Sequence, residues 1–242
     1  MKIIKYLLII VAAFILIERP HFTLLKPQQI KTALPQHVKS RLGTSAHAKL
    51  QGIDISHYDG RVDFELVGQS NVHFVYMKAT QGTTYIDPTY QGRVSALKGS
   101  ELLHGAYHFY EPDKDAIAQA THFLEQIKIS KHTLPPMLDV EITQQTPPED
   151  IKKGVKLWLE HVHKALKCQP ILYSYGSFWE ENLGDEFNDY PFWLADYATK
   201  PNVPAQLKNW RIWQYTDQGQ ISGIEHKVDR NILIEKELTC HV

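Results

Sequence analysis

Two acids separated by one residue follow a short apolar run near the middle of the chain. Asp139 and Glu141 end the stretch PPMLDVE at 135–141. If this stretch is a strand, its alternate side chains point to one side, which places the two carboxyl groups about 6–7 Å apart in one cleft. Two carboxylates at that separation do not both ionise freely, so one keeps its proton near neutral pH. A retained proton is what general acid cleavage of a glycosidic bond requires, although acids are also common at solvated strand ends.

Two further acids interrupt apolar segments near the two ends of the folded region. Asp54 lies in GIDISHY at 52–58, where an isolated charge is costly to bury, so it must be paired or take part in chemistry. Asp229 lies in KVDRN at 227–231, within the last predicted strand. If the strands close into a barrel, the last strand lies beside the first. Asp54 and Asp229 then reach the same mouth as Asp139 and Glu141.

Aromatic residues and one amide gather at or near the ends of the predicted strands. Sugar rings stack on aromatic faces, and tyrosine hydroxyl groups bond sugar hydroxyl or acetamido groups. Plain core packing is the alternative for any aromatic residue in a barrel. The candidate substrate-binding residues are Tyr107, Tyr173, Tyr58, Trp193, Gln214 and Tyr215.

Eight short apolar or aromatic runs have the texture of buried strands. They lie at 51–55, 73–79, 102–110, 137–142, 170–175, 192–197, 211–215 and 227–233. Two clear helical patterns lie between them, one capped by Asp113 and one opened by Pro147 and Pro148. Shorter helices fit 62–67 and 89–98.

The spacing of these runs predicts an α/β fold built on a barrel. Helix-sized connections separate the first five strands, which implies right-handed crossovers and a parallel sheet. The connection at 216–226 has no helical pattern and suits a hairpin-like return. We therefore expect an irregular TIM-like β/α barrel of about eight strands, whose last strands are connected without full helices. Active sites of such barrels lie at the carboxyl ends of the strands.

The N-terminal residues have the features of a targeting segment. Lys2 and Lys5 precede an unbroken apolar run at 6–17, followed by a proline-containing polar stretch. Residues 1–20 are predicted to be a signal peptide or an N-terminal membrane anchor, 21–49 a linker, and 50–242 the catalytic domain. Either form exports the domain, secreted if the signal is cleaved and tethered at the cell envelope if it is retained.

The composition excludes several classes of function. The net charge is −1, from 26 basic and 27 acidic residues, so no nucleic-acid-binding surface is indicated. The thirteen histidines form no set at metal-ligand spacing, and no glycine-rich phosphate loop occurs, so we expect neither metal nor cofactor. Cys168 and Cys240 are the two cysteines, and an exported chain leaves open a disulfide or two free thiols.

A series of motifs resembles glycoside hydrolase family 25, the lysozymes that act as N-acetylmuramidases. The matching stretches keep the family's order and cover most of 51–233. They are GIDISHYDGRVDF (52–64), FVYMKATQG (74–82), DPTY (87–90), GAYHFY (105–110), LPPMLDVE (134–141), ILYSY (171–175), PFWLADY (191–197), WRIWQYT (210–216) and GIEHKVDRN (223–231).

The resemblance implies a modified β/α barrel that cleaves the β-1,4 bond between N-acetylmuramic acid and N-acetylglucosamine in peptidoglycan. Glu141 matches the family's proton donor, and Asp54, Asp139 and Asp229 match its other active-site acids. Asp139 is expected to orient the substrate acetamido group or to stabilise the oxocarbenium-like state. The family's mechanism is argued to be retaining with substrate assistance, but an inverting outcome stays open. The fold works as a monomer, and we expect no partner other than the glycan.

The chain departs from the family pattern at position 81, where Gln81 stands in KATQG in place of the usual glutamate. This position is not one of the catalytic acids, so the change predicts altered substrate contacts or local hydrogen bonding. Two alternative functions stay open. One is a glycosidase acting on chitin or another N-acetylated glycan, and the other is a non-catalytic glycan-binding domain.

Overall fold

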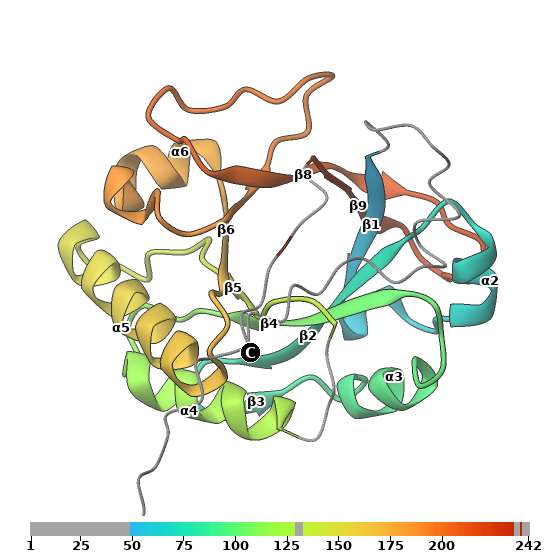
Figure 1. The fold of residues 1–242 in the computed structure, drawn as a ribbon. Helices are drawn as coiled ribbons and strands as arrows, with labels where there is room; N and C mark the ends of the chain where they lie inside the picture. The colour runs from blue at the N-terminus through green and yellow to red at the C-terminus, as the bar shows by residue number, and fades with distance from the viewer. Residues whose placement is uncertain (1–48, 129–132, 235–237, 239–242) are drawn as a thin grey trace, which may run out of the picture.

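Eight strands close into a barrel in the computed structural model, which describes residues 49–128, 133–234 and 238 (Figure 1). Around the barrel, β1 is followed by β9, β8, β7, β6, β5, β4 and β2, and pairing of β1 with β2 completes the circle. The short strand β3 (Tyr85–Ile86) pairs with β2 outside this circle. The barrel strands are β1 (Leu50–Ile55), β2 (Phe74–Gln81), β4 (Leu103–Phe109), β5 (Met137–Asp139), β6 (Ile171–Tyr175), β7 (Phe192–Ala195), β8 (Trp210–Gly219) and β9 (Val228–Leu233).

The direction of β9 distinguishes this barrel from a regular one. Each pairing from β1 through β2, β4, β5, β6 and β7 to β8 is parallel, whereas β9 is antiparallel to both β8 and β1. The connection at 220–227 is too short for a crossover helix, so the chain reverses direction instead. The predicted irregular TIM-like barrel and its hairpin-like last connection are therefore confirmed.

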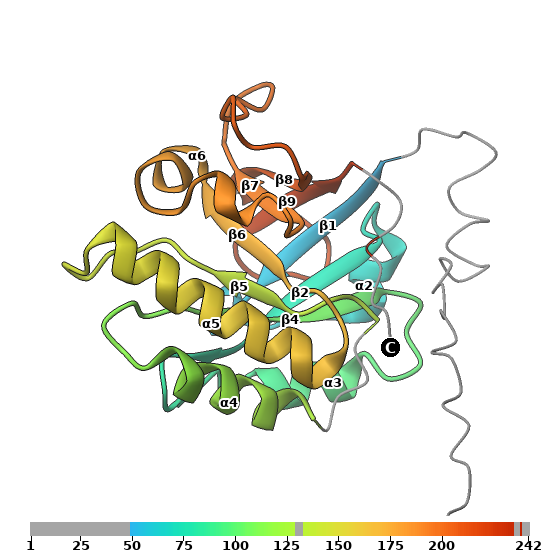
Figure 2. The same cartoon turned by 60° about the vertical axis from the view of Figure 1, so that its left-hand side comes forward.

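Helices cover part of the outer wall. The longer ones are α2 (Phe64–Gln69), α3 (Tyr90–Ala96), α4 (Ala116–Ile127) and α5 (Pro148–Leu166), and the last two run side by side (Figure 2). Helix α5 begins at Pro148 as expected. The cap of α4 is Asp115, which accepts a hydrogen bond from the Ala118 amide, so the prediction of Asp113 was wrong by two residues. Short helical turns follow β1 and β6, namely η1 (His57–Asp59), α6 (Gly176–Phe178), η2 (Trp179–Leu183) and η3 (Asp185–Phe187).

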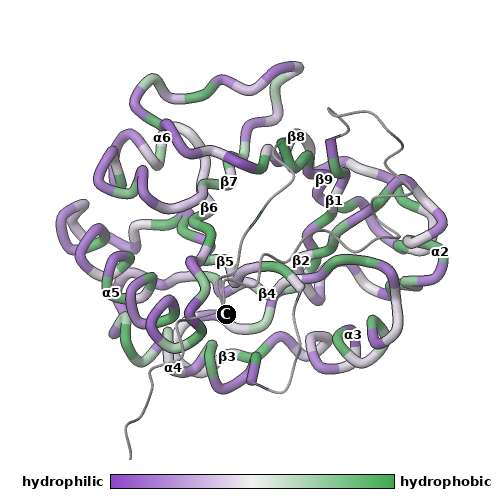
Figure 3. Tube along the Cα trace, viewed as in Figure 1, coloured by the Kyte–Doolittle hydropathy of each residue, from purple (hydrophilic) through white to green (hydrophobic). Residues whose placement is uncertain are grey.

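Alternation along the strands divides the apolar side chains into two cores. One fills the barrel and includes Leu50, Tyr76, Tyr173 and Trp193. The other lies between the outer wall and the helices. Figure 3 shows how strands and helices differ in hydropathy. The strands carry long hydrophobic stretches, whereas α5 alternates between hydrophobic and hydrophilic residues. A strand buried on both faces needs such a continuous apolar run.

The structure shortens one predicted strand, and the predictions for the N-terminal segment and for Cys240 fall outside the described residues. The predicted strand at 137–142 ends at Asp139, so Glu141 lies two residues beyond β5. Residues 1–48 are outside the described residues, and so is Cys240, whereas Cys168 is disulfide-bonded. Within 49–128, 133–234 and 238, no helix has the length and apolar character needed to cross a membrane.

Gly105 gives the barrel interior room for a tyrosine ring. A Cβ atom at this position would overlap the ring of Tyr76, which is fully buried and donates its hydroxyl hydrogen to the Pro135 carbonyl oxygen at 2.9 Å. The close approach of β4 to this ring therefore requires a residue without a side chain.

Replacing Gly105 by Ala is expected to lower the free energy of unfolding by about 1–3 kcal/mol, because the added methyl group overpacks the core. Gly92→Ala in α3 is the matched control. Its Cβ would meet nothing within 4 Å, and alanine should stabilise the helix by about 0.5–1 kcal/mol. Urea unfolding of both variants measures the difference. Equal stabilities would contradict this account of the barrel interior.

Candidate active site

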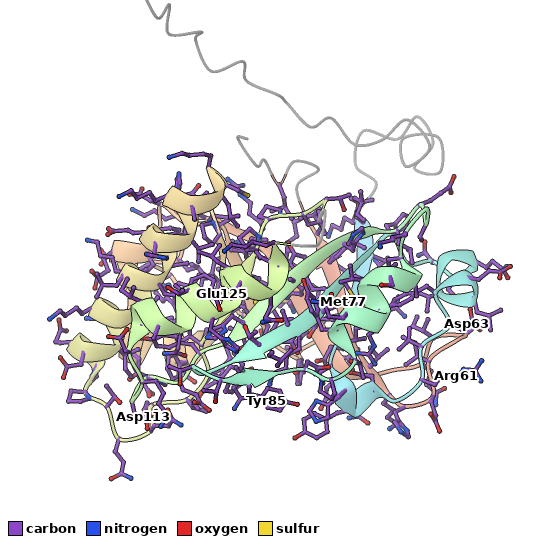
Figure 4. The ribbon with its side chains drawn as sticks, turned by 90° about the horizontal axis from the view of Figure 1, so that it is seen from below. Arg61, Asp63, Met77, Tyr85, Asp113 and Glu125 are labelled. Carbon is purple, nitrogen blue, oxygen red and sulfur yellow. The ribbon has the colours of Figure 1, made fainter. Side chains whose placement is uncertain are left out.

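Three of the four predicted acids, Asp54, Asp139 and Asp229, point into the barrel at one mouth, and Glu141 lies next to Asp139 just beyond the end of β5. Asp54 shares the inner side of β1 with Leu50, whereas Ile53 and Ile55 belong to the outer core. Asp139 ends β5 in the same inward phase as Met137. The mouth is the edge where the parallel strands end, and Figure 4 shows Tyr85 and Asp113, which follow β2 and β4, on this edge of the molecule.

The reversed strand brings Asp229 to the same mouth. Asp229 is the second residue of β9, so it lies near the amino end of that strand. Because β9 is antiparallel, its amino end lies beside the carboxyl end of β1, and Asp229 is the direct register partner of Asp54. Opposite residues of neighbouring antiparallel strands project to the same side, so the two carboxyl groups meet and hydrogen-bond.

The Asp54–Asp229 pair keeps a proton at pH values well above those at which carboxyl groups usually ionise. Burial is the main cause that raises the pKa of Asp229 to about 9, and the neighbouring charge of Asp54 adds to it. Burial also raises the pKa of Asp54, but hydrogen bonds from its neighbours work in the opposite direction. The geometry therefore favours an ionised Asp54 that accepts a proton donated by Asp229.

An amide on the neighbouring strand β9 satisfies one oxygen of Asp54. The Asn231 Nδ2 group donates to Asp54 Oδ2 at 2.7 Å, and Trp193 Nε1 donates to Asn231 Oδ1 at 3.0 Å. Asn231 and Trp193 are both fully buried. The indole thus fixes the orientation of the amide, which in turn presents its N–H groups to the carboxylate.

A second amide reaches Asp54 from β8. The Gln214 Nε2 group donates to both oxygens of Asp54 at 3.1 and 3.3 Å. The hydroxyl groups of Tyr173 and Tyr197 donate to Gln214 Oε1 at 2.9 and 2.8 Å. Two phenols therefore orient this amide in the same way that the indole orients Asn231.

The Asp139–Glu141 pair lies across the mouth from these groups. Burial raises the pKa of Asp139 well above its usual range, and the charge of Glu141 raises it further. Asp139 Oδ1 is buried and has no hydrogen-bond partner among the described residues. A buried acceptor without a donor costs about 1–3 kcal/mol, so this oxygen can accept a hydrogen bond from a molecule that enters the mouth.

Backbone contacts hold the segment that carries Glu141. The Val140 amide donates to the Tyr173 carbonyl oxygen at 3.0 Å, and Ser174 Oγ donates to the Val140 carbonyl oxygen at 2.6 Å. The Tyr175 hydroxyl reaches the Glu141 carbonyl oxygen at 3.4 Å. Glu141 is therefore fixed against β6 although it lies beyond the end of β5.

The loop after β1 carries an exposed aromatic residue at the mouth. Tyr58 is 77% exposed, and its ring lies 3.9 Å from that of His57. Asp87 accepts hydrogen bonds from the backbone amide and Nδ1 of His57 at 2.9 and 3.0 Å. The buried Arg93 donates to the carbonyl oxygens of Ser56 and Gly60, which fixes the loop from below.

A groove of about 640 Å³ begins beside Tyr175, where β6 and β7 end. It is mostly polar, and none of the four acids lines it, although the hydroxyl of its lining residue Tyr175 reaches the Glu141 carbonyl oxygen. Its lining residues are Tyr175, Gly176, Ser177, Glu180, Ala195, Asp196, Asn202, Val203, Pro204 and Ala205. Within the part of the chain that the structure describes, no group of three or more His, Cys, Asp or Glu side chains could hold a metal ion.

Comparison with known proteins gives the family. The sequence pattern described as "Glycosyl hydrolases family 25" matches residues 53–224. The chain belongs to this family. It is 34% identical over 182 residues to the autolytic lysozyme of Clostridium acetobutylicum, covering 74% of this chain and 54% of that protein. It is 29% identical over 208 residues to lysozyme M1 of Streptomyces globisporus, covering 78% of this chain and 69% of that protein.

A solved structure has the same fold. The family 25 glycosyl hydrolase of Bacillus anthracis superposes with a TM-score of 0.72 at 26% identity, covering 80% of this chain and 95% of that one. The resemblance stated from the motifs is therefore confirmed for this family 25 hydrolase.

The predicted substrate-binding residues lie in three different environments of the family 25 hydrolase. Tyr58 is at the exposed rim, and Gln214 and Tyr173 belong to the hydrogen-bond network under Asp54. Tyr107 is buried in the barrel, where the charges of Asp54 and Asp139 add to burial in raising its pKa. These residues stay candidates for substrate contact or for shaping the site.

Two predicted contacts need correction. Trp193 is fully buried in the inner core, so it has no face to offer a sugar and acts on Asn231 instead. Tyr215 donates to Gln51 Oε1 at 3.4 Å, and Gln51 belongs to the outward phase of β1. Tyr215 therefore lies on the outer wall. The sequence pattern indicated the strand, but not which side of it faced the mouth.

Three site residues were not predicted. Asn231 follows Asp229 by two residues, so strand alternation alone could have indicated it. Tyr197 lies two residues after β7 ends and is 54% exposed, and no local signal pointed to it. Lys78 is an inward-facing cation within β2. A lysine inside an apolar strand is costly to bury, and that pattern was the signal that could have indicated it.

Replacing Asp229 by Asn is expected to stabilise the hydrolase, increasingly so as pH rises from about 4 toward 9. Because the pKa of Asp229 is raised from 3.8 to about 9, the folded state keeps a proton that the unfolded chain releases above pH 4. Stability of the original chain therefore falls through this window, and asparagine removes the loss. Urea unfolding near pH 5 and pH 8 measures the effect. The exposed Asp189→Asn is the control, and a gain from Asp229→Asn that is equal at both pH values would refute the prediction.

Proposed function

We propose that the four acids at the barrel mouth cleave the β-1,4 bond between N-acetylmuramic acid and N-acetylglucosamine in peptidoglycan. The observation that carries this proposal is the buried, unpartnered Oδ1 of Asp139 beside Glu141. An acetamido N–H is a donor of the right kind for this oxygen, and both sugars of the polymer carry one. The names of the lysozyme relatives support the same substrate.

Glu141 supplies the proton for bond cleavage. Burial and the charge of Glu141 raise the pKa of Asp139, so Asp139 keeps a proton in the unliganded site, which it shares with Glu141 in a hydrogen bond. When the substrate N–H donates to Asp139, the shared proton moves to Glu141, which protonates the glycosidic oxygen. The leaving sugar departs with that proton as its new hydroxyl group.

Asp139 orients the acetamido group as a nucleophile. The acetamido oxygen attacks the anomeric carbon as the glycosidic bond breaks, which forms a cyclic oxazolinium ion and leaves no bond to the enzyme. Glu141, now ionised, removes a proton from water, and the water opens the ring. Two successive inversions give overall retention. The ionised Asp54 supplies a fixed negative charge facing the cationic intermediate.

Export of the domain fits this substrate, because peptidoglycan lies outside the cytoplasmic membrane. The apolar run at 6–17 after Lys2 and Lys5 would direct export, whether the segment is cleaved or retained as an anchor. A glycosidase acting on chitin and a non-catalytic glycan-binding domain are the competing functions. Digestion of purified peptidoglycan beside chitin distinguishes them.

Glu141→Gln is expected to lower the rate of peptidoglycan hydrolysis by at least about 10²-fold, because glutamine has no proton to donate. The original chain should release new reducing ends on N-acetylmuramic acid from peptidoglycan, and few or none from chitin. Glu160→Gln, an exposed site on the outer helix α5, is the matched control and should keep full activity. Unchanged hydrolysis by Glu141→Gln would disprove its role.

Substrate assistance predicts that the N-acetyl group of muramic acid is required. Peptidoglycan with de-N-acetylated muramic acid should be cleaved roughly 10²-fold more slowly or worse, because the nucleophile is missing. Chemical re-acetylation of the same material should restore the rate, which controls for damage to the polymer. Equal rates on both materials would instead favour direct attack by water.

A further inference from the structure

Gln81, the position that departs from the family pattern, joins a cation to an anion at the mouth of the barrel. Lys78 Nζ donates to Gln81 Oε1 at 2.7 Å, and Gln81 Nε2 donates to Glu111 Oε1 at 2.9 Å. Lys78 and Gln81 belong to β2, whereas Glu111 lies two residues after β4. The three side chains therefore form a continuous chain from the barrel interior to the loop after β4.

The chemistry of the three groups fixes the orientation of the amide. A lysine ammonium only donates hydrogen bonds, and an ionised carboxylate only accepts them. Between these two partners an amide has one satisfactory orientation, with its oxygen toward Lys78 and its nitrogen toward Glu111. A glutamate at position 81 would accept from Lys78 equally well but would repel Glu111. The residue types at positions 81 and 111 are therefore coupled.

The side chain of Gln119 holds the backbone of Glu111 in a fixed position. Gln119, fully buried on α4, accepts from the Glu111 amide and donates to the Glu111 carbonyl oxygen, both at 2.9 Å. Gly82 has φ +54°, and a Cβ there would collide with the Glu111 carboxylate. The fold thus both anchors Glu111 and leaves room for its side chain.

Lys78 is a buried cation on the inner side of β2, the side that also carries the acids of the site. It is 8% exposed and lies over the ring of Phe109 at 4.7 Å, with the ring of Tyr85 at 5.8 Å. Burial lowers its pKa, whereas four acids raise it: Asp139, Asp87, Glu111 and Glu141. In return, the charge of Lys78 lowers the pKa of Asp139 and so offsets part of the effect of burial.

We propose that Glu111 is a positioning residue, which orients Gln81 so that the ammonium group of Lys78 stays at the barrel mouth that holds Asp139. The family pattern has a negative charge at position 81. In this chain the negative charge belongs to Glu111, which lies one side chain further from Lys78, on the loop after β4. The role in turnover rests on the function proposed above. Glu111 itself does not touch the substrate.

The test is a charge exchange between positions 81 and 111. Glu111→Gln replaces a group that only accepts hydrogen bonds by an amide that both accepts and donates, so position 111 no longer dictates the orientation of Gln81, and kcat is expected to fall roughly tenfold with little change in KM. Gln81→Glu places two carboxylates together and should lower kcat at least as much. In the double variant, the new amide at position 111 donates to the new carboxylate at position 81, which also accepts from Lys78. The kcat of the double variant should therefore return to within about threefold of the original.

The pH–rate profile separates positioning from a general loss of structure. If Lys78 moves away in Glu111→Gln, the pKa of Asp139 rises, and the limb of the profile that reports Asp139 should shift to higher pH. The double variant should restore the original limb. Glu125→Gln, on the exposed side of α4 (Figure 4), is the control for loss of one carboxylate and should change neither property.

Multiplicative losses in the double variant, or a Glu111→Gln variant indistinguishable from Glu125→Gln, would overturn the inference. Melting temperatures are measured for the original chain, the two single variants and the double variant. If a single variant unfolds under assay conditions, recovery of the melting temperature in the double variant supports the coupling, and no recovery overturns it. If the original chain does not hydrolyse peptidoglycan, the proposed function fails, and the melting-temperature cycle decides the coupling by itself.

Discussion

Burial of carboxyl groups is the constraint on which the rest of this structure depends. Asp54 and Asp139 are removed from water at the mouth of a barrel whose interior is filled mainly by apolar side chains. A charge in such a place is stable only if hydrogen bonds or an opposite charge compensate for lost hydration. The two acids meet this requirement in different ways, and the difference gives the site its chemistry.

Hydrogen bonds compensate Asp54 for lost hydration to a greater extent than Asp139. Two oriented amides, from Gln214 and Asn231, and the proton of Asp229 stabilise Asp54 as an anion. Asp139 has a charged neighbour in Glu141, a more remote cation in Lys78, and one oxygen without a donor among the described residues. Incomplete satisfaction lowers stability but leaves a position for substrate, which is the usual balance between stability and function in an active site.

The barrel determines where these groups meet. Parallel strands bring their carboxyl ends to one edge, and the reversal of β9 adds the amino end of that strand to the same edge. A parallel last strand would have directed the Asp229 end of the strand toward the opposite opening. The irregular connection before β9 is therefore a requirement of the site, because it pairs Asp229 with Asp54.

The sequence by itself determined the strands and the barrel, because apolar runs of strand length are local signals. It also singled out the four acids, from their places in these runs and from the resemblance to family 25. The tertiary structure alone decided which groups share protons and which are accessible. Trp193 and Tyr215 match the family's motifs, yet one is buried and the other lies on the outer wall. Gln81 and Glu111 are thirty positions apart, and their coupling exists only because β2 and β4 are neighbours. Local sequence encodes burial and direction along a strand, whereas hydrogen bonds between strands depend on how the barrel closes.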